Sequence, residues 1–155
     1  MTETLRAPAT WRPSPPATWP KDGKATRIFD YATILFAAGF MFHNVDHLRR
    51  GVNAVTHEVL IEGTLLSILS ITAIGLVIAR HRLAPMFAMV VGFIGAPGVA
   101  AVHLLPTWSA FSDSFPSGHV DNISWAAAIS EVVALFLFGC AGLYVRRRDR
   151  ALLAS

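Results

Sequence analysis

The sequence predicts an all-α integral membrane protein, in which four transmembrane helices form an up-down-up-down bundle with both termini in the cytoplasm. Of the 155 residues, 54% are hydrophobic and only 15% are charged, whereas soluble domains have about 25% charged residues. Four apolar segments are long enough to cross a hydrocarbon core, which takes about 20 residues per helix. We therefore expect a multi-pass protein of the cell membrane (the inner or plasma membrane), with the lipid bilayer as its surroundings.

The N-terminal part, residues 1–26, is predicted to be a proline-rich cytoplasmic tail. Its prolines at positions 8, 13, 15, 16 and 20 favour extended structure and oppose a helix. Trp11 and Trp19 could anchor such a tail at the membrane interface or on a neighbouring subunit. The tail is one reason to expect other membrane subunits, or further copies of this chain, as partners.

Four predicted spans follow the tail and make up a transmembrane domain at residues 27–146. They cover residues 28–48, 55–79, 83–105 and 120–145. The first three are joined by short connections, which make consecutive helices antiparallel neighbours and favour the up-down-up-down order. Gly92, Gly95 and Gly98 place a strip of small residues on the third span, where another helix can approach closely. Residues 147–155 form a basic cytoplasmic tail.

The distribution of lysine and arginine predicts the orientation of the spans. Most of these residues lie before the first span, between the second and third, and after the fourth, so the positive-inside rule places both termini in the cytoplasm. Arg49 and Arg50 lie on the opposite side, where they can neutralise nearby carboxylates or bind lipid headgroups. Because the basic residues stand where a membrane protein needs them, the net charge of +3 does not indicate a nucleic-acid partner.

Histidines gather on one side of the predicted bundle. Five of the six lie at the ends of the spans that share the extracytoplasmic side, and these are His43, His47, His57, His103 and His119. His43 and His47 are four residues apart and so share one helix face. Ionisable residues at membrane depth are costly, and they usually face the bundle interior, pair with one another, or serve a site. The convergence of histidine from all four spans therefore predicts a polar site there.

Carboxylates accompany these histidines, and both residue types are common metal ligands. The candidate carboxylates are Asp46, Glu58, Glu62 and Asp121. We expect the nine residues to supply a transition-metal site for iron, zinc or copper, or two axial histidines for a haem. Thiolate clusters are excluded because Cys140 is the only cysteine. Both redox and hydrolytic chemistry are compatible with such a site. Oxidoreductase chemistry is slightly favoured, because a site in the outer leaflet suits lipid-soluble reductants, and the sequence leaves open whether the protein is an enzyme.

Two short motifs resemble those of known families. Pro116, Ser117, Gly118 and His119 match the PSGH element of the type 2 membrane phosphatidic acid phosphatases, in which the histidine is a general acid. That family also needs a Lys-x6-Arg-Pro element and a Ser-Arg-x5-His-x3-Asp element, and neither occurs here. His43-x-x-x-His47 is similar to the zincin motif, but Asn44 stands where the catalytic glutamate belongs. Neither mechanism is carried over to this chain.

Two other functions remain compatible with the sequence. The chain could be an accessory subunit of a larger membrane complex without chemistry of its own, given its short length and proline-rich tail. It could also be the protomer of a proton-coupled transporter, as Glu62 and Glu131 suggest. Glu131 lies about 15 Å along the fourth span, close to the middle of the membrane. A carboxylate at that depth usually has a function.

Overall fold

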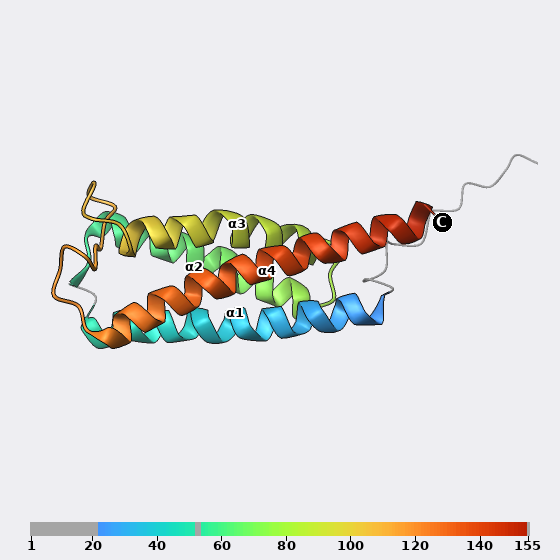
Figure 1. Cartoon of the computed structure of the whole chain (residues 1–155), viewed down its shortest axis with the longest axis horizontal. Coiled ribbons are helices and arrows are strands. Elements are labelled where there is room, and N and C mark those ends of the chain that lie inside the picture. The colour runs from blue at the N-terminus through green and yellow to red at the C-terminus, as the bar shows by residue number, and fades with distance from the viewer. Residues whose placement is uncertain (1–21, 52–53, 155) are drawn as a thin grey trace, which may run out of the picture.

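A computed structural model of the chain describes residues 22–51 and 54–154, and it is helical throughout its spans (Figure 1). The four helices are α1 (Gly23–Arg50), α2 (His57–Ile78), α3 (Ala84–His103) and α4 (Asn122–Ala154). Each is long and apolar enough to cross a membrane, and the described residues contain no strand. The all-α class and the number of spans are therefore confirmed at this level.

The ends of the helices follow from local capping. Asp22 caps α1 by accepting hydrogen bonds from the backbone N–H groups of Lys24 (2.9 Å) and Ala25 (3.3 Å). Because of this cap, α1 begins inside the segment that was predicted to be a tail, whose prolines and tryptophans lie outside the described residues. The helix ends at Gly51, whose φ of 91° is a conformation that favours glycine. At the other end of the chain, α4 continues through residues 147–154, because arginine is a good helix former.

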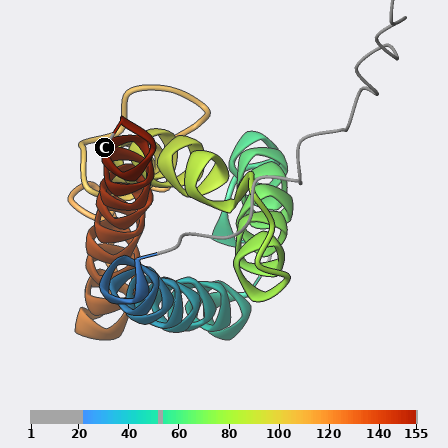
Figure 2. The same ribbon diagram turned by 90° about the vertical axis from the view of Figure 1, so that its right-hand side faces the viewer.

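The helices lie side by side, and α4 provides most of the packing (Figures 1 and 2). It packs against both α1 and α3, while α2 packs mainly against α3 and touches α1 little. The centre of the α1–α4 interface is a stack of rings, in which Phe138 lies 4.8 Å from Phe36 and 5.7 Å from Phe29 between centroids. All three side chains are fully buried.

Glycines set the distance between α3 and α4. A Cβ atom added to Gly92 would lie 2.5 Å from the backbone nitrogen of Gly139 and from the carbonyl oxygen of Leu135. A Cβ atom on Gly142 would lie 2.6 Å from the carbonyl oxygen of Pro85. These backbones can approach so closely only because neither position carries a side chain, which confirms the expected role of Gly92 in helix packing.

One end of the bundle carries the long connection between α3 and α4, and we call it the loop end. Residues 104–121 form this connection, which lies beside the C-terminal end of α1 (Figure 1). Thr56, the N-cap of α2, donates a hydrogen bond of 2.6 Å to the carbonyl oxygen of Ala110 in the same connection. The α3–α4 connection, the C-terminal end of α1 and the N-terminal end of α2 therefore meet at the loop end, next to the histidines of α1 and α3.

A candidate metal centre at the loop end

Helix α1 presents two histidines on one face of its C-terminal half. His43 and His47 are one turn apart, with ring centroids separated by 4.6 Å. His43 is 6% exposed, and His47 is half-buried. Their Nε2 atoms lie 2.8 Å apart. The i,i+4 spacing read from the sequence thus brings two potential ligand atoms to one point.

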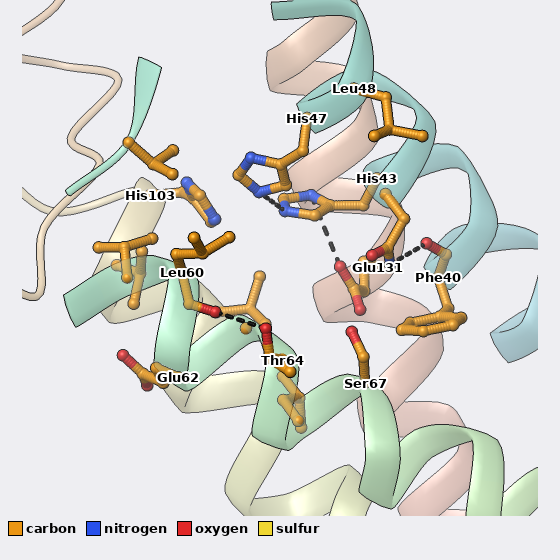
Figure 3. Close-up of a pocket in the computed structure, with 17 residues that line it drawn as sticks. Phe40, His43, His47, Leu48, Leu60, Glu62, Thr64, Ser67, His103 and Glu131 are labelled. Atoms are coloured by element: carbon orange, nitrogen blue, oxygen red, sulfur yellow. Dashed lines mark hydrogen bonds and ion pairs between the residues drawn. The ribbon is translucent and has the colours of Figure 1, made fainter. Parts of the chain in front are cut away.

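Helix α3 adds the third histidine, which is its last residue. His103 is 3% exposed, and its ring centroid lies 4.7 Å from that of His43 and 5.4 Å from that of His47. Each of the three rings offers one nitrogen atom that lies within 4.8 Å of those of the other two. Figure 3 shows the rings turned toward one another at one end of a pocket. We call these residues the three-histidine cluster.

The Nδ1 atoms of the cluster all face protein groups. The Nδ1 atom of His43 lies 3.5 Å from a carboxylate oxygen of Glu131 on α4. That of His103 lies 3.4 Å from a carboxylate oxygen of Asp113. The Nδ1 atom of His47 instead lies 3.2 Å from a guanidinium nitrogen of Arg50, which can only donate. Nδ1 therefore faces a protein group in all three rings, although that of His43 makes no hydrogen bond, and we assign Nε2 as the atom available to a ligand.

Carboxylates beside metal-binding histidines have a known effect. They hold the proton on Nδ1, fix the orientation of the ring and make Nε2 a better ligand. Glu131 is placed to do this for His43, and Asp113 for His103. Arg50 has the opposite effect on His47, because a donor facing Nδ1 favours the tautomer with its proton on Nε2. A metal bound here would therefore meet two rings with a carboxyl group near Nδ1 and a third, His47, that has to lose a proton from Nε2 first.

Two arginines tie the loop to α1 at this end. Arg50 lies 2.6 Å from a carboxylate oxygen of Asp113 and 3.2 Å from one of Asp46. Arg49 donates to Asp46 at 2.7 Å and to Asp121 at 2.8 Å. Of the two roles expected for these arginines, neutralising carboxylates is confirmed. Asp46, only 2% exposed, lies between both guanidinium groups.

The carboxyl groups of the loop owe their acidity to these contacts. Burial alone would raise the pKa of Asp113, but hydrogen bonds from His103 and Arg50 outweigh it and hold the pKa well below its usual range. The hydrogen bond from Arg49 likewise lowers the pKa of Asp121. Both groups are therefore ionised at neutral pH, and the ion pairs that hold the loop persist there.

An aromatic residue of the loop covers the cluster. Phe115 is 2% exposed, and its ring centroid lies 4.8 Å from that of His103 and 5.5 Å from that of Trp125. The guanidinium carbon of Arg50 lies 5.2 Å from the centre of the Phe115 ring. A backbone hydrogen bond of 2.9 Å from Phe115 to the carbonyl oxygen of His103 completes the contact. The loop end is thereby closed over the three histidines.

The other side of the cluster opens into a pocket of about 320 Å³ between α1, α2 and α3 (Figure 3). Most of its wall is apolar, with Phe40, Val59 and Val102 among the lining residues. Glu62 of α2 also lines it, and so does Glu131 of α4. The cluster thus forms the polar end of an otherwise apolar cavity.

The structure brings together some of the nine residues expected from the sequence and separates others. His43, His47 and His103 form the cluster, and Glu62 lines the same pocket. Among the described residues, no other group of three histidine, cysteine or carboxylate side chains meets the geometry of a metal site. The remaining candidates lie apart from the cluster, because His57 and His119 are exposed, Glu58 is half-buried, and Asp46 and Asp121 pair with arginines.

Two residues beside the cluster were not expected to serve it. The sequence suggests a transport role for Glu131 at mid-membrane depth, whereas the structure places its carboxyl group 3.5 Å from Nδ1 of His43. Asp113 lies in a loop, where helical spacing gives no signal, and it contacts Arg50 across 63 positions of sequence. Residues 106–118 contain no lysine or arginine, and Asp113 is the single charged residue in that stretch, which is the one sequence feature that singles it out.

Comparison with known proteins gives no further identification. No protein-family model, no curated protein and no solved structure matches this chain.

Proposed function

We propose that this protein is a multi-pass membrane protein built around a transition-metal site, with His43, His47 and His103 as its ligands. The observation that carries the proposal is the approach of three ring nitrogens to within 4.8 Å of one another at the polar end of a pocket. Two of the rings have a carboxylate on the nitrogen that faces away from the others, as metal-binding histidines commonly do.

The distances in the cluster suit a small ion. Nitrogens bound to one zinc ion lie about 2.0–2.1 Å from it, and so about 3.3 Å from each other in a tetrahedral arrangement. The 2.8 Å between the Nε2 atoms of His43 and His47 reaches that value after a small rotation of the rings. Three imidazole ligands suit zinc, copper or iron, and three-histidine sites with a fourth, open position are typical of catalytic metal ions.

Of the cofactors considered from the sequence, an ion fits this arrangement better than a haem. A haem held by two histidines lies between their rings, so the rings must be separated by the flat macrocycle. Here every pair of rings in the cluster is in contact, with centroid separations between 4.6 and 5.4 Å. If the ion is iron or copper, the site can support redox chemistry, in agreement with the oxidoreductase reading.

The test is the metal content of protein purified in mild detergent without a histidine tag. We expect about one ion per chain in the wild type, because three ligands converge on one point. His43→Ala and His103→Ala should abolish binding, whereas His47→Ala should weaken it less, since Arg50 opposes the ligand form of that ring. His57→Ala and His119→Ala are matched controls at exposed positions and should keep the ion. Folded wild-type protein that neither contains nor takes up a metal would refute the proposal.

We also propose the up-down-up-down order of the spans, with both termini on the cytoplasmic side of the cell membrane. Contacts between distant residues support this order, because Arg80 after α2 pairs with Asp30 of α1 at 2.6 Å, and Arg148 of α4 pairs with Asp22 at 2.8 Å. Arg49 and Arg50 lie on the side that this orientation places outside the cell. Both are paired with carboxylates, which offset their charge, so they weigh little against the positive-inside rule. The roles of accessory subunit and proton-coupled transporter stay predictions.

A further inference from the structure

The pocket beside the three-histidine cluster has the size and lining of a small-molecule site. Its volume of about 320 Å³ lies at the lower end of the range of about 300–1,000 Å³ for ligand pockets. That space suits one ring with a short chain, and it is too small for a phospholipid with two acyl chains. The ring of Phe40 and the imidazole rings line it, and aromatic rings of this kind pack well against another ring.

Access to this pocket is lateral, between α1 and α2. Phe115 and Arg50 cover the cluster from the loop end, as described above. Between α1 and α2, the lining includes residues with large exposed fractions, namely Leu48 of α1 (71%) and Leu60 of α2 (44%). Because α1 and α2 touch little, the entrance lies between them. In the proposed membrane arrangement this side faces the hydrocarbon, so a ligand arrives dissolved in the bilayer.

The charges in the pocket select the head group of that ligand. Glu62 and Glu131 line the pocket, and no lysine or arginine does. A phosphate or carboxylate head would therefore face two carboxyl groups without a compensating positive side chain, and only a bound metal ion would offset this cost. A hydroxyl group can donate to a carboxylate or to an imidazole nitrogen. The polar end thus favours an uncharged donor over an anion.

We propose that the pocket binds an uncharged, lipid-soluble phenol or quinol that enters between α1 and α2 and places its hydroxyl group at the three-histidine cluster. The inference rests on the proposed metal centre in one respect: whether the hydroxyl group of the ligand contacts a metal ion or the free imidazole rings. The pocket and its lining exist independently of any ion.

The experiment uses photolabelling of the full-length protein in lipid nanodiscs. The probe is a 4-alkylphenol with a diazirine in its alkyl chain, and two companion probes carry a methyl ether or a carboxylate in place of the hydroxyl group. Labelled positions are mapped by mass spectrometry, and unlabelled 4-alkylphenol is the competitor. We expect saturable labelling of the pocket-lining parts of α1 and α2 by the phenol, with little specific labelling by the ether or the carboxylate.

Gly63→Phe is the blocking variant, and Gly75→Phe is its matched control. Both glycines lie on α2 with open space where a side chain would be added, but only Gly63 lines the pocket. We expect Gly63→Phe to lower the specific labelling about tenfold or more and Gly75→Phe to leave it unchanged. Ser67→Leu, a second pocket-lining substitution, serves if Gly63→Phe does not fold.

Metal content is measured on the same samples, so the two proposals can fail separately. Retained metal with lost labelling in Gly63→Phe supports the ligand site. Head-group-dependent labelling of a protein that neither contains nor takes up a metal would support the ligand site and refute the metal centre. Equal labelling by phenol and ether, labelling that survives in Gly63→Phe, or an equal loss in Gly75→Phe would overturn the ligand site whatever the metal content.

Discussion

His103 shows how much a single position depends on its surroundings in this protein. Its backbone belongs to the last residue of α3, while its ring contacts a histidine of α1 and both Asp113 and Phe115 of the loop. The i,i+4 spacing of His43 and His47 made their common face predictable. The choice of His103 rather than His57 or His119 as the third member depends on helix rotation and loop path, which hydropathy leaves open.

At the residue scale, we expect Glu131→Gln to weaken metal binding by about 10–100-fold without abolishing it. Glu131 is 2% exposed, and a carboxyl oxygen lies 3.5 Å from Nδ1 of His43, close enough to orient the ring when a metal binds. Affinity is measured by competition with a chelator of known strength. Glu58→Gln, at a half-buried position that does not line the pocket, is the control. An unchanged affinity in Glu131→Gln would show that this carboxylate does not support the site.

Asp113 gives a prediction for the pH dependence of stability. Its pKa is lower in the folded protein than the value of about 3.9 in an unfolded chain. Such a group stabilises the fold above its unfolded pKa, and this contribution is lost as the pH falls toward the folded pKa. We expect Asp113→Asn to lower the free energy of unfolding by about 1–2 kcal/mol at pH 7, and the difference from the wild type to shrink below about pH 4.

Thermal unfolding in detergent at several pH values measures this difference. Asp30→Asn is the comparison, because Asp30 pairs with Arg80 at a more exposed position and should contribute no more than about 1 kcal/mol. A difference between Asp113→Asn and the wild type that stays constant down to pH 3 would contradict the assignment of the effect to the charge of Asp113.

At the element scale, helix ends were less predictable than helix existence. Helix α1 begins before its apolar segment, because Asp22 caps it, and α4 continues past its apolar segment through the arginines. Hydropathy detects the part of a helix that lies in hydrocarbon. It does not detect the polar turns beyond it, which are set by capping and by intrinsic helix propensity.

Close packing of α3 on α4 leads to a second stability prediction. We expect Gly92→Ala to destabilise the protein by about 1–3 kcal/mol, as overpacking typically does, because the new Cβ atom meets backbone atoms at 2.5 Å. Gly75→Ala meets open space and should be neutral or stabilising by about 0.5–1 kcal/mol. Thermal unfolding of the two variants side by side provides the measurement, and equal stabilities would refute the packing argument.

At the scale of the whole molecule, composition and apolar length were sufficient to predict four membrane-spanning helices. They were not sufficient to predict the arrangement around the histidines. That arrangement depends on Arg50, Asp113 and Phe115, whose contacts cross long stretches of sequence. Long-range pairs of this kind leave no periodic pattern, so only the folded structure reveals them.

The proposed orientation is tested by labelling with a membrane-impermeant maleimide in a Cys140→Ser background. Thr107→Cys lies at an exposed loop-end position and Arg82→Cys at an exposed position between α2 and α3. If the termini are cytoplasmic, intact cells should label Thr107→Cys, and Arg82→Cys should react only after the membrane is permeabilised. The reverse pattern would invert the topology while leaving the three-histidine cluster as described.

The cover that Phe115 and Arg50 place over the histidines also bears on the assembly of the protein. A hydrated ion approaching the folded bundle meets this cover on one side and an apolar cavity wall on the other. If the proposed metal centre forms, its loading should therefore be easiest during biogenesis, before residues 104–121 dock onto α1. Once the loop is in place, the rate at which a bound ion exchanges should report how often Arg50 and Asp113 separate, rather than how tightly the histidines hold the metal.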